Sequence, residues 1–202
     1  AASAGARFII LANQLIGKAN MALVAKLLQE GTEVFVCVDH PSQAQALSDF
    51  FQPLQLTLAL LIEFGIAGGR CGCRTEAEVM ALATQIDSLP ALSLAGIEFY
   101  EGVVKGADPE QGVRLLVQQA AGLMLSLSTQ QLLHGTTQFI SGAGSVWYDV
   151  VAEELTAAQL PQHIKLVLRP GCYISHDQGI YQQAQQRVQA RSSLACSLGE
   201  DL

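Results

Sequence analysis

Two glycine-containing turns carry the residues of this sequence that could do chemistry. The first, Ser141-Gly-Ala-Gly-Ser145, follows a short apolar run and precedes a helical pattern. The second, Arg169-Pro-Gly-Cys-Tyr173, follows the apolar run 164–168 and would leave the amides of Gly171 and Cys172 free. Unpaired N–H groups at such turns, and the dipole of a following helix, favour bound phosphate. The two turns together therefore predict one phosphate clamp.

The five cysteines, Cys37, Cys71, Cys73, Cys172 and Cys196, do not have the spacing of a disulfide framework. An odd number of cysteines suits a reducing compartment, which predicts a cytoplasmic protein. Cys71-Gly-Cys73 could bind a metal or act in redox chemistry, but it has no second pair and no nearby histidine. We therefore interpret this pair as small buried thiols and predict no metal ligands in the chain.

Composition indicates one globular domain. The chain has 202 residues, of which 50% are hydrophobic and 14% charged, which is enough to bury a core. A net charge of −7 and scattered basic residues argue against nucleic acid as a partner. No apolar stretch reaches membrane-spanning length, and residues 1–7 do not resemble a signal peptide. We therefore expect neither nucleic acid nor a membrane as a partner.

Short buried strands alternate with helices along the chain. Unbroken apolar runs predict buried strands, and apolar residues at helical spacing predict helices. The predicted strands are 7–12, 34–38, 56–63, 94–100, 137–141 and 164–168, and the predicted helices are 18–29, 42–51, 75–86, 109–133 and 146–155. This alternation is typical of a parallel sheet covered by helices, with functional residues at the carboxyl ends of its strands. Six strands do not close an eight-stranded barrel, so we expect either an open sheet or a barrel without two N-terminal βα units.

Several motifs occur in the order of a known family. They are Asn13-Gln-Leu-Ile-Gly17, Val38-Asp39, Glu63 with Gly68-Gly-Arg-Cys-Gly72, Gly96-Ile-Glu-Phe-Tyr-Glu-Gly102, Ser141-Gly-Ala-Gly-Ser145, and Leu168-Arg-Pro-Gly-Cys-Tyr173 with His176-Asp177. Across residues 5–181 they resemble the D-serine deaminase/D-threonine aldolase-like family of pyridoxal-phosphate enzymes. The loop 68–74 and Cys172 resemble the bacterial amino acid deaminase branch more than the aldolases. Ala143 stands where the family usually has glycine.

The resemblance implies an α/β fold, a (β/α)8 TIM-type barrel of the alanine racemase N-terminal kind, with about six strands in this chain. Residues 1–181 would form the pyridoxal-phosphate-binding barrel without its N-terminal βα units, and residues 182–202 would connect it to a C-terminal β domain outside the chain. Family members bind the cofactor through a lysine in a Pro-His-x-Lys-type motif, and none of Lys18, Lys26, Lys105 and Lys165 lies in one. We therefore expect the middle of a longer homodimeric enzyme, with the Schiff-base lysine, and any divalent metal, outside this segment.

The resemblance also implies residues that bind pyridoxal phosphate. The phosphate cradle would consist of Gly144, Ser145, Gly171 and Cys172, helped by the hydroxyl of Tyr173. Either Tyr100 or Arg169 would face the pyridine nitrogen, although Tyr100 could instead be a rim tyrosine. An arginine there would keep the nitrogen unprotonated, which suits a racemase better than an eliminase.

Three further residues resemble family residues that act near the substrate. Arg70 would lie near the ring edge or the substrate carboxylate, or would form a surface salt bridge. His176 and Asp177 could supply a general base or a metal-linked group, and a local turn in which Asp177 caps the next helix is an equal alternative. We interpret Glu63 as a buried structural carboxylate that holds Arg70.

The leading functional hypothesis is a D-amino-acid ammonia-lyase that takes a small D-amino acid of the D-serine type. A lysine would remove the α-hydrogen, and loss of the β-hydroxyl would give a 2-oxo acid and ammonia. The alternatives within the family are retro-aldol cleavage of D-threonine and amino acid racemisation. An alternative of another class is a non-catalytic pyridoxal-phosphate-binding protein or a folded fragment.

Overall fold

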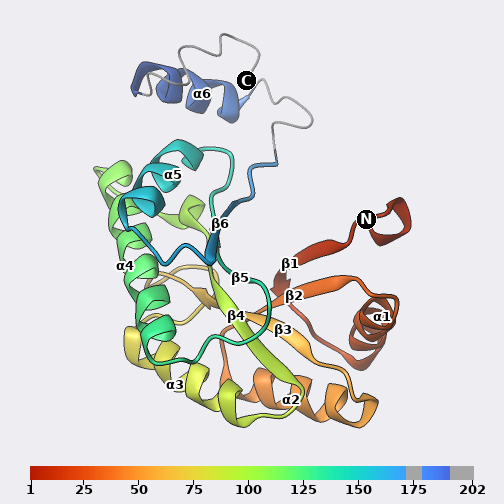
Figure 1. The fold of residues 1–202 in the computed structure, drawn as a ribbon. Helices are drawn as coiled ribbons and strands as arrows, with labels where there is room; N and C mark the ends of the chain where they lie inside the picture. The colour runs from red at the N-terminus through yellow and green to blue at the C-terminus, as the bar shows by residue number, and fades with distance from the viewer. Residues whose placement is uncertain (172–178, 192–202) are drawn as a thin grey trace.

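The computed structural model describes residues 1–171 and 179–191 of the chain (Figure 1). Its strands are β1 (Phe8–Gln14), β2 (Glu33–Val38), β3 (Leu58–Phe64), β4 (Leu92–Phe99), β5 (Gln138–Gly142) and β6 (Ile164–Leu168). Its helices are α1 (Lys18–Gln29), α2 (Pro41–Phe51), α3 (Glu76–Ser88), α4 (Pro109–Thr129), α5 (Tyr148–Ala157) and α6 (Ile180–Arg191). Each predicted strand and helix forms within a few residues of its expected bounds, and α6 is an addition.

The strands form one six-stranded parallel sheet in the order β1-β2-β3-β4-β5-β6. Because every strand pairs with the next one along the chain, the sheet curls in one direction, and helices α1 to α5 cover its outer side (Figure 1). This arrangement is the curled part of a (β/α) barrel. The predicted α/β barrel-type fold is confirmed.

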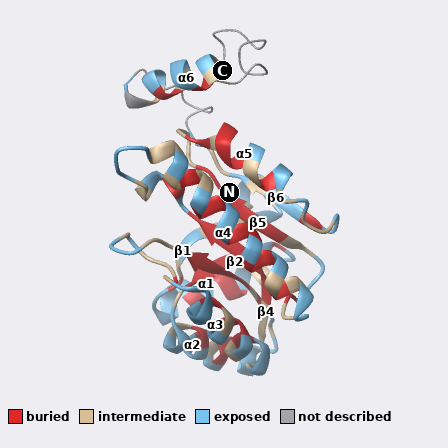
Figure 2. Cartoon of the chain, turned by 90° about the vertical axis from the view of Figure 1, so that its left-hand side faces the viewer, coloured by how far each residue is buried: buried red, intermediate tan, exposed pale blue. Residues whose placement is uncertain are grey.

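Apolar side chains pack on both faces of the sheet, as expected for parallel strands. The larger cluster fills the space between the strands and the helices. A smaller cluster on the inner face consists of Phe35, Leu61, Ala95 and Phe139, and the ring centroid of Phe8 lies 4.7 Å from that of Phe35. Figure 2 shows the buried positions running through the strands and along the helix sides that face them.

A change of register between β3 and β4 determines which side chains reach the inner face at the end of the sheet. The pairing shifts between Leu60 and Leu61, so that Gly96 pairs with Leu61 and Glu98 pairs with Glu63. Glycine is required at position 96, because a Cβ there would lie 1.8 Å from the carbonyl oxygen of Phe139. Paired residues of parallel strands share a face, and Leu61 lies on the inner face, so both carboxylates point inward.

The start of α3 has a capping-box sequence, Thr75-Glu-Ala-Glu78, and the box forms in part. The hydroxyl of Thr75 accepts a hydrogen bond from the backbone N–H of Glu78 at 3.2 Å, as the motif requires. The carboxylate of Glu78 accepts its bond from the N–H of Arg74 at 2.6 Å. The reciprocal bond has therefore moved one residue before the cap.

Helix α6 lies in the segment that the sequence assigns to a connector, and it is attached to α5. The Nε of Arg191 donates to Asp149 Oδ2 at 2.6 Å, and its guanidinium lies 4.9 Å from the centroid of the Trp147 ring. Val188 is fully buried. The role of residues 182–202 as a connector stays a prediction. Within the ranges that the structure describes, none of the helices is both long and apolar enough to cross a bilayer.

Candidate functional site

Polar side chains gather on the inner face where the strands end. Gln14 from β1, Glu63 from β3, Glu98 from β4 and Ser141 from β5 lie at this edge, and Arg169 directly follows β6. The carboxyl edge of a parallel barrel is the usual place for a functional site. The lower part of the inner face carries the apolar cluster, so the polar groups form a separate layer above it.

Arg169 links three strands through its side chain. Its guanidinium forms an ion pair with Glu98 and also donates to the carbonyl of Phe99 at 3.2 Å. Its Nε donates to the hydroxyl of Ser141 at 2.8 Å. One of the two residues predicted to face a pyridine nitrogen is therefore held rigidly on the inner face.

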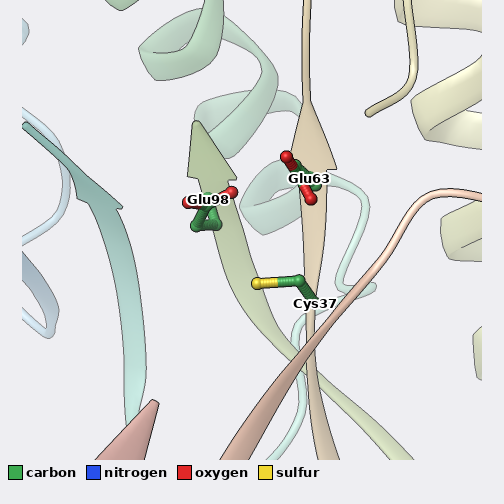
Figure 3. Close-up of side chains that lie close together, drawn as sticks. All are labelled: Cys37, Glu63 and Glu98. Atoms are coloured by element: carbon green, nitrogen blue, oxygen red, sulfur yellow. The ribbon is translucent and has the colours of Figure 1, made fainter. Parts of the chain in front are cut away.

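Glu98 is almost fully buried beside this guanidinium. Burial raises the pKa of Glu98 to about 7, because Arg169 only partly offsets the loss of solvent and the nearby Glu63 adds repulsion. Within the described part of the chain, its Oε2 has no hydrogen-bond partner. Figure 3 shows Glu98, Glu63 and Cys37 converging from neighbouring strands. Buried oxygens without a partner are uncommon, so this atom marks a place where a proton or a ligand is expected.

Glu63 is held by Gln14 and Cys71 rather than by Arg70. Gln14 Nε2 donates to Oε2 at 2.9 Å, and the Cys71 thiol donates to Oε1 at 2.8 Å. The interpretation that Glu63 holds Arg70 is therefore wrong. Arg70 is exposed, and the pKa of its guanidinium is raised chiefly by a hydrogen bond with the neighbouring Cys71. Its catalytic role stays a prediction.

The loop after β3 folds back onto the strand ends and so delivers Cys71 to Glu63. The N–H of Gly72 donates to Asp39 Oδ2 at 2.8 Å, and the N–H of Cys73 donates to the Glu63 carbonyl at 2.8 Å. Both loop cysteines are free thiols, with Cys73 buried and Cys71 half-buried. Burial raises the pKa of Cys73 to about 12. The cysteine pair therefore positions the loop, and the interpretation as small buried thiols holds for Cys73 but not for the half-buried Cys71.

The two glycine-containing turns lie against each other. The N–H of Gly171 donates to Ser145 Oγ at 3.1 Å. Among the described residues, a Cβ at Gly171 would meet no atom within 4 Å, so space remains in front of this backbone. Gly144 is different, because its N–H donates to the fully buried carboxylate of Glu101 at 2.7 Å. The structure thus joins Ser145 to Gly171, so the prediction that the Gly171 amide is free is wrong, and it directs the Gly144 amide to a protein carboxylate.

Tyr100 borders the first turn. It follows β4 directly and is 39% exposed. A Cβ on Gly144 would lie 3.1 Å from Tyr100 Cε2, so the ring lies against the turn. Tyr100 and Arg169 therefore approach the turns from different strands, and both remain candidates for the pyridine nitrogen.

Four predicted site residues, Cys172, Tyr173, His176 and Asp177, lie outside the described residues. Their assigned roles stay predictions. The four lysines of the chain are all exposed.

Sequence reasoning missed Glu98 and Glu101 as members of the site, although both lie in the motif from Gly96 to Gly102. A signal was present, because charged residues are rarely buried unless they are paired. A glutamate inside the apolar run Leu94-Ala-Gly-Ile-Glu-Phe99 therefore indicates a partner elsewhere in the fold. The identity of that partner, Arg169, depends on which strands are neighbours.

No family model matches the sequence. The chain is 29% identical over 162 residues to the D-threonine aldolase of Arthrobacter sp., an alignment that covers 78% of this chain and 42% of that protein. It is 26% identical over 148 residues to the 3-hydroxy-D-aspartate aldolase of Paracoccus denitrificans, covering 73% and 38%. The chain thus spans about two fifths of the length of these curated relatives.

Solved structures agree with the fold. The D-threonine aldolase of Filomicrobium marinum superposes with a TM-score of 0.67 and 20% identity, over 85% of this chain and 44% of that one. The D-threo-3-hydroxyaspartate dehydratase of Delftia sp. HT23 gives 0.62 and 15%, with the same coverage. PipY of Synechococcus elongatus, solved with pyridoxal phosphate bound, gives 0.52 and 17% over 76% of this chain and 66% of that one.

The fold is therefore that of the alanine racemase-like barrel proteins. In sequence, the chain is a homologue of D-threonine aldolase and 3-hydroxy-D-aspartate aldolase. The family resemblance stated from the motifs is confirmed.

Proposed function

We propose that the protein to which this chain belongs is a pyridoxal-phosphate-dependent lyase that acts on D-3-hydroxy amino acids. The observation that carries the proposal is the 162-residue alignment with a D-threonine aldolase. It is supported by the way the fold brings Arg169, Ser145 and Gly171 to one edge of the sheet.

The residues at this edge fit pyridoxal phosphate. The Ser145 hydroxyl accepts a hydrogen bond from the Gly171 N–H, and a Cβ at Gly171 would meet no described atom within 4 Å, which leaves room for a phosphate group where the two turns meet. Arg169 supplies N–H donors for the pyridine ring. When bound, pyridoxal phosphate withdraws electrons from the bonds at the substrate α-carbon.

The chain's own residues hold these donors in place. Glu98 and Ser141 fix the Arg169 side chain, so its N–H groups need no reorganisation on binding. Glu98 is also the counter-charge of Arg169 in a setting with little water, which strengthens their attraction. Tyr100 would border the opposite side of the turns, where its exposed ring can shield bound groups from solvent.

Retro-aldol cleavage is the first of two candidate reactions, because the curated relatives are aldolases. In it, the Cα–Cβ bond of D-threonine breaks, the hydroxyl proton is lost, a proton is added at Cα, and glycine and acetaldehyde form. Deamination is the second candidate, and the resemblance of the loop 68–74 to the deaminase branch favours it. In deamination, the Cα–H and Cβ–O bonds break with loss of water. Hydrolysis of the resulting imine takes up one water, so the net products are a 2-oxo acid and ammonia.

Product analysis of the complete protein with pyridoxal phosphate tests the proposal. Glycine with acetaldehyde from D-threonine indicates the aldolase, and 2-oxo acid with ammonia from D-serine or D-threonine indicates the deaminase. Release of the L-isomer alone would indicate a racemase and contradict the lyase proposal. Failure to convert any D-3-hydroxy amino acid while pyridoxal phosphate is bound would leave a non-catalytic carrier.

The contribution of the two turns can be measured without catalysis. We expect Ser145→Ala to weaken binding of pyridoxal phosphate about tenfold, since one charge-assisted hydrogen bond is lost. Absorbance titration measures this, with Ser126→Ala as the control because Ser126 lies on α4. Equal affinities for the two variants would remove Ser145 from the phosphate site.

A further inference from the structure

Three potential metal ligands meet on the inner face below Arg169. Cys37 from β2, Glu63 from β3 and Glu98 from β4 each offer one ligand atom, and these atoms lie within 4.8 Å of one another. All three residues are buried. We call this group the inner triad (Figure 3).

One buried oxygen of Glu98 points to a bound ligand. Its side chain is 4% exposed, and Arg169 occupies only Oε1. Its Oε2 has no partner among the described residues. In Figure 3 one carboxylate oxygen of Glu98 is directed toward Glu63, and the sulfur of Cys37 points into the space beneath them.

We propose that the inner triad binds one divalent, thiophilic metal ion of the zinc type. Thiolate sulfur and carboxylate oxygen together are a donor set that suits zinc better than magnesium or calcium. Zinc bonds of about 2.0–2.3 Å place tetrahedral ligands roughly 3.3–3.8 Å apart, within the 4.8 Å limit that the three ligand atoms meet. Three protein ligands leave the fourth position for water.

Charge balance supports the proposal. Binding displaces the Cys37 thiol proton, and also the Glu98 proton where that carboxyl is protonated. The resulting thiolate and two carboxylates are balanced by the divalent ion together with the Arg169 guanidinium, which already contacts Glu98. Without the ion, and within residues 1–171 and 179–191, the Arg169 guanidinium pairs with Glu98 alone, and Glu63 has only the uncharged partners Gln14 and Cys71.

Neighbouring groups already orient two of the ligands. Gln14 donates to Glu63 Oε2. Arg169 donates to Glu98 Oε1 and leaves Oε2 for the ion. Groups of this kind, which bond to metal ligands, hold them in a binding geometry. This inference does not depend on the proposed lyase activity.

The test is metal stoichiometry and spectroscopy on the complete, chelator-treated protein with added Co²⁺ or Zn²⁺. We expect Cys37→Ser to bind one ion fewer per chain than the wild type and to lose the near-ultraviolet thiolate-to-cobalt charge-transfer band. Glu98→Gln should bind Co²⁺ at least tenfold more weakly while keeping a band from Cys37. Zn²⁺ should raise the Tm of the wild type more than that of either variant.

Cys73→Ser is the matched control, because Cys73 is a buried free thiol whose side chain donates to the Asp39 carbonyl rather than to a ligand of the inner triad. It should retain the stoichiometry and the band. The proposal is overturned if the wild type shows no Cys37-dependent ion, or if Cys73→Ser removes the band as fully as Cys37→Ser. Circular dichroism checks that each variant folds. If Cys37→Ser does not fold, the Co²⁺ affinity of Glu98→Gln tests the proposal, and an affinity equal to that of the wild type overturns it.

Discussion

Removal of the Arg169 guanidinium should destabilise the fold far more than its partly exposed position suggests. Arg169 is 22% exposed at its side chain, but its partner Glu98 is only 4% exposed. In Arg169→Met, Glu98 would remain buried without its counter-charge, and the bonds to Ser141 and the Phe99 carbonyl would also be lost. Breaking a buried pair from one side costs about 3–5 kcal/mol, and we expect a loss in that range.

The cause can be isolated by a double-mutant cycle. Glu98→Gln removes the charge and should cost about 1–3 kcal/mol, since it leaves a buried polar group imperfectly paired. In the double variant Arg169→Met with Glu98→Gln, no unpaired charge remains. It should therefore lose about 1–3 kcal/mol less stability than the sum of the losses in the two single variants. Urea unfolding followed by circular dichroism measures all four free energies. If the two single-variant losses add up to the loss in the double variant within about 0.5 kcal/mol, the view that buried Glu98 needs Arg169 as its counter-charge is refuted.

Two further predictions concern the framework around the site. Burial raises the pKa of Glu101, whose carboxylate accepts from Gly144, so the native state binds its proton more tightly than the unfolded state does. Its contribution to the free energy of unfolding is therefore full below the unfolded pKa of about 4.3 and is lost as pH rises through the higher folded pKa. Glu101→Gln should reduce this loss of stability with rising pH. If urea unfolding shows the same pH dependence for the variant and the wild type, the prediction is contradicted. Gly96→Ala should cost about 3 kcal/mol or prevent folding, since its Cβ would overlap a backbone carbonyl of β5. Gly122→Ala, in α4 with open space around the new Cβ, should instead stabilise by about 0.5–1 kcal/mol; similar Tm shifts for both variants would mean that the close approach at Gly96 is unimportant.

The cofactor turns show how far local sequence reasoning reaches. That both turns end strands and lie at one edge follows from the alternation of strands and helices. That Gly144 gives its N–H to Glu101 does not follow, because the carboxylate and the amide are 43 positions apart. One amide that the first turn was predicted to offer to a bound anion, that of Gly144, is therefore bonded to the carboxylate of Glu101.

Local patterns determined the elements themselves. Helix α1 and strand β6 were predicted at the bounds that the structure shows, because helix periodicity and short apolar runs are read from neighbouring residues. The order of the strands was not settled in this way, because the alternation of strands and helices fits both an open sheet and a barrel. The parallel α/β architecture was nevertheless contained in the sequence.

Only the tertiary structure decided which polar groups meet inside the sheet. The register shift between β3 and β4 places Glu98 beside Glu63, and the path of the chain after β6 brings Arg169 to Glu98, 71 positions away. The folded loop delivers Cys71 to Glu63 in place of the expected Arg70. Such contacts depend on strand register and loop path, which are determined by packing of the whole sheet rather than by any local stretch of residues.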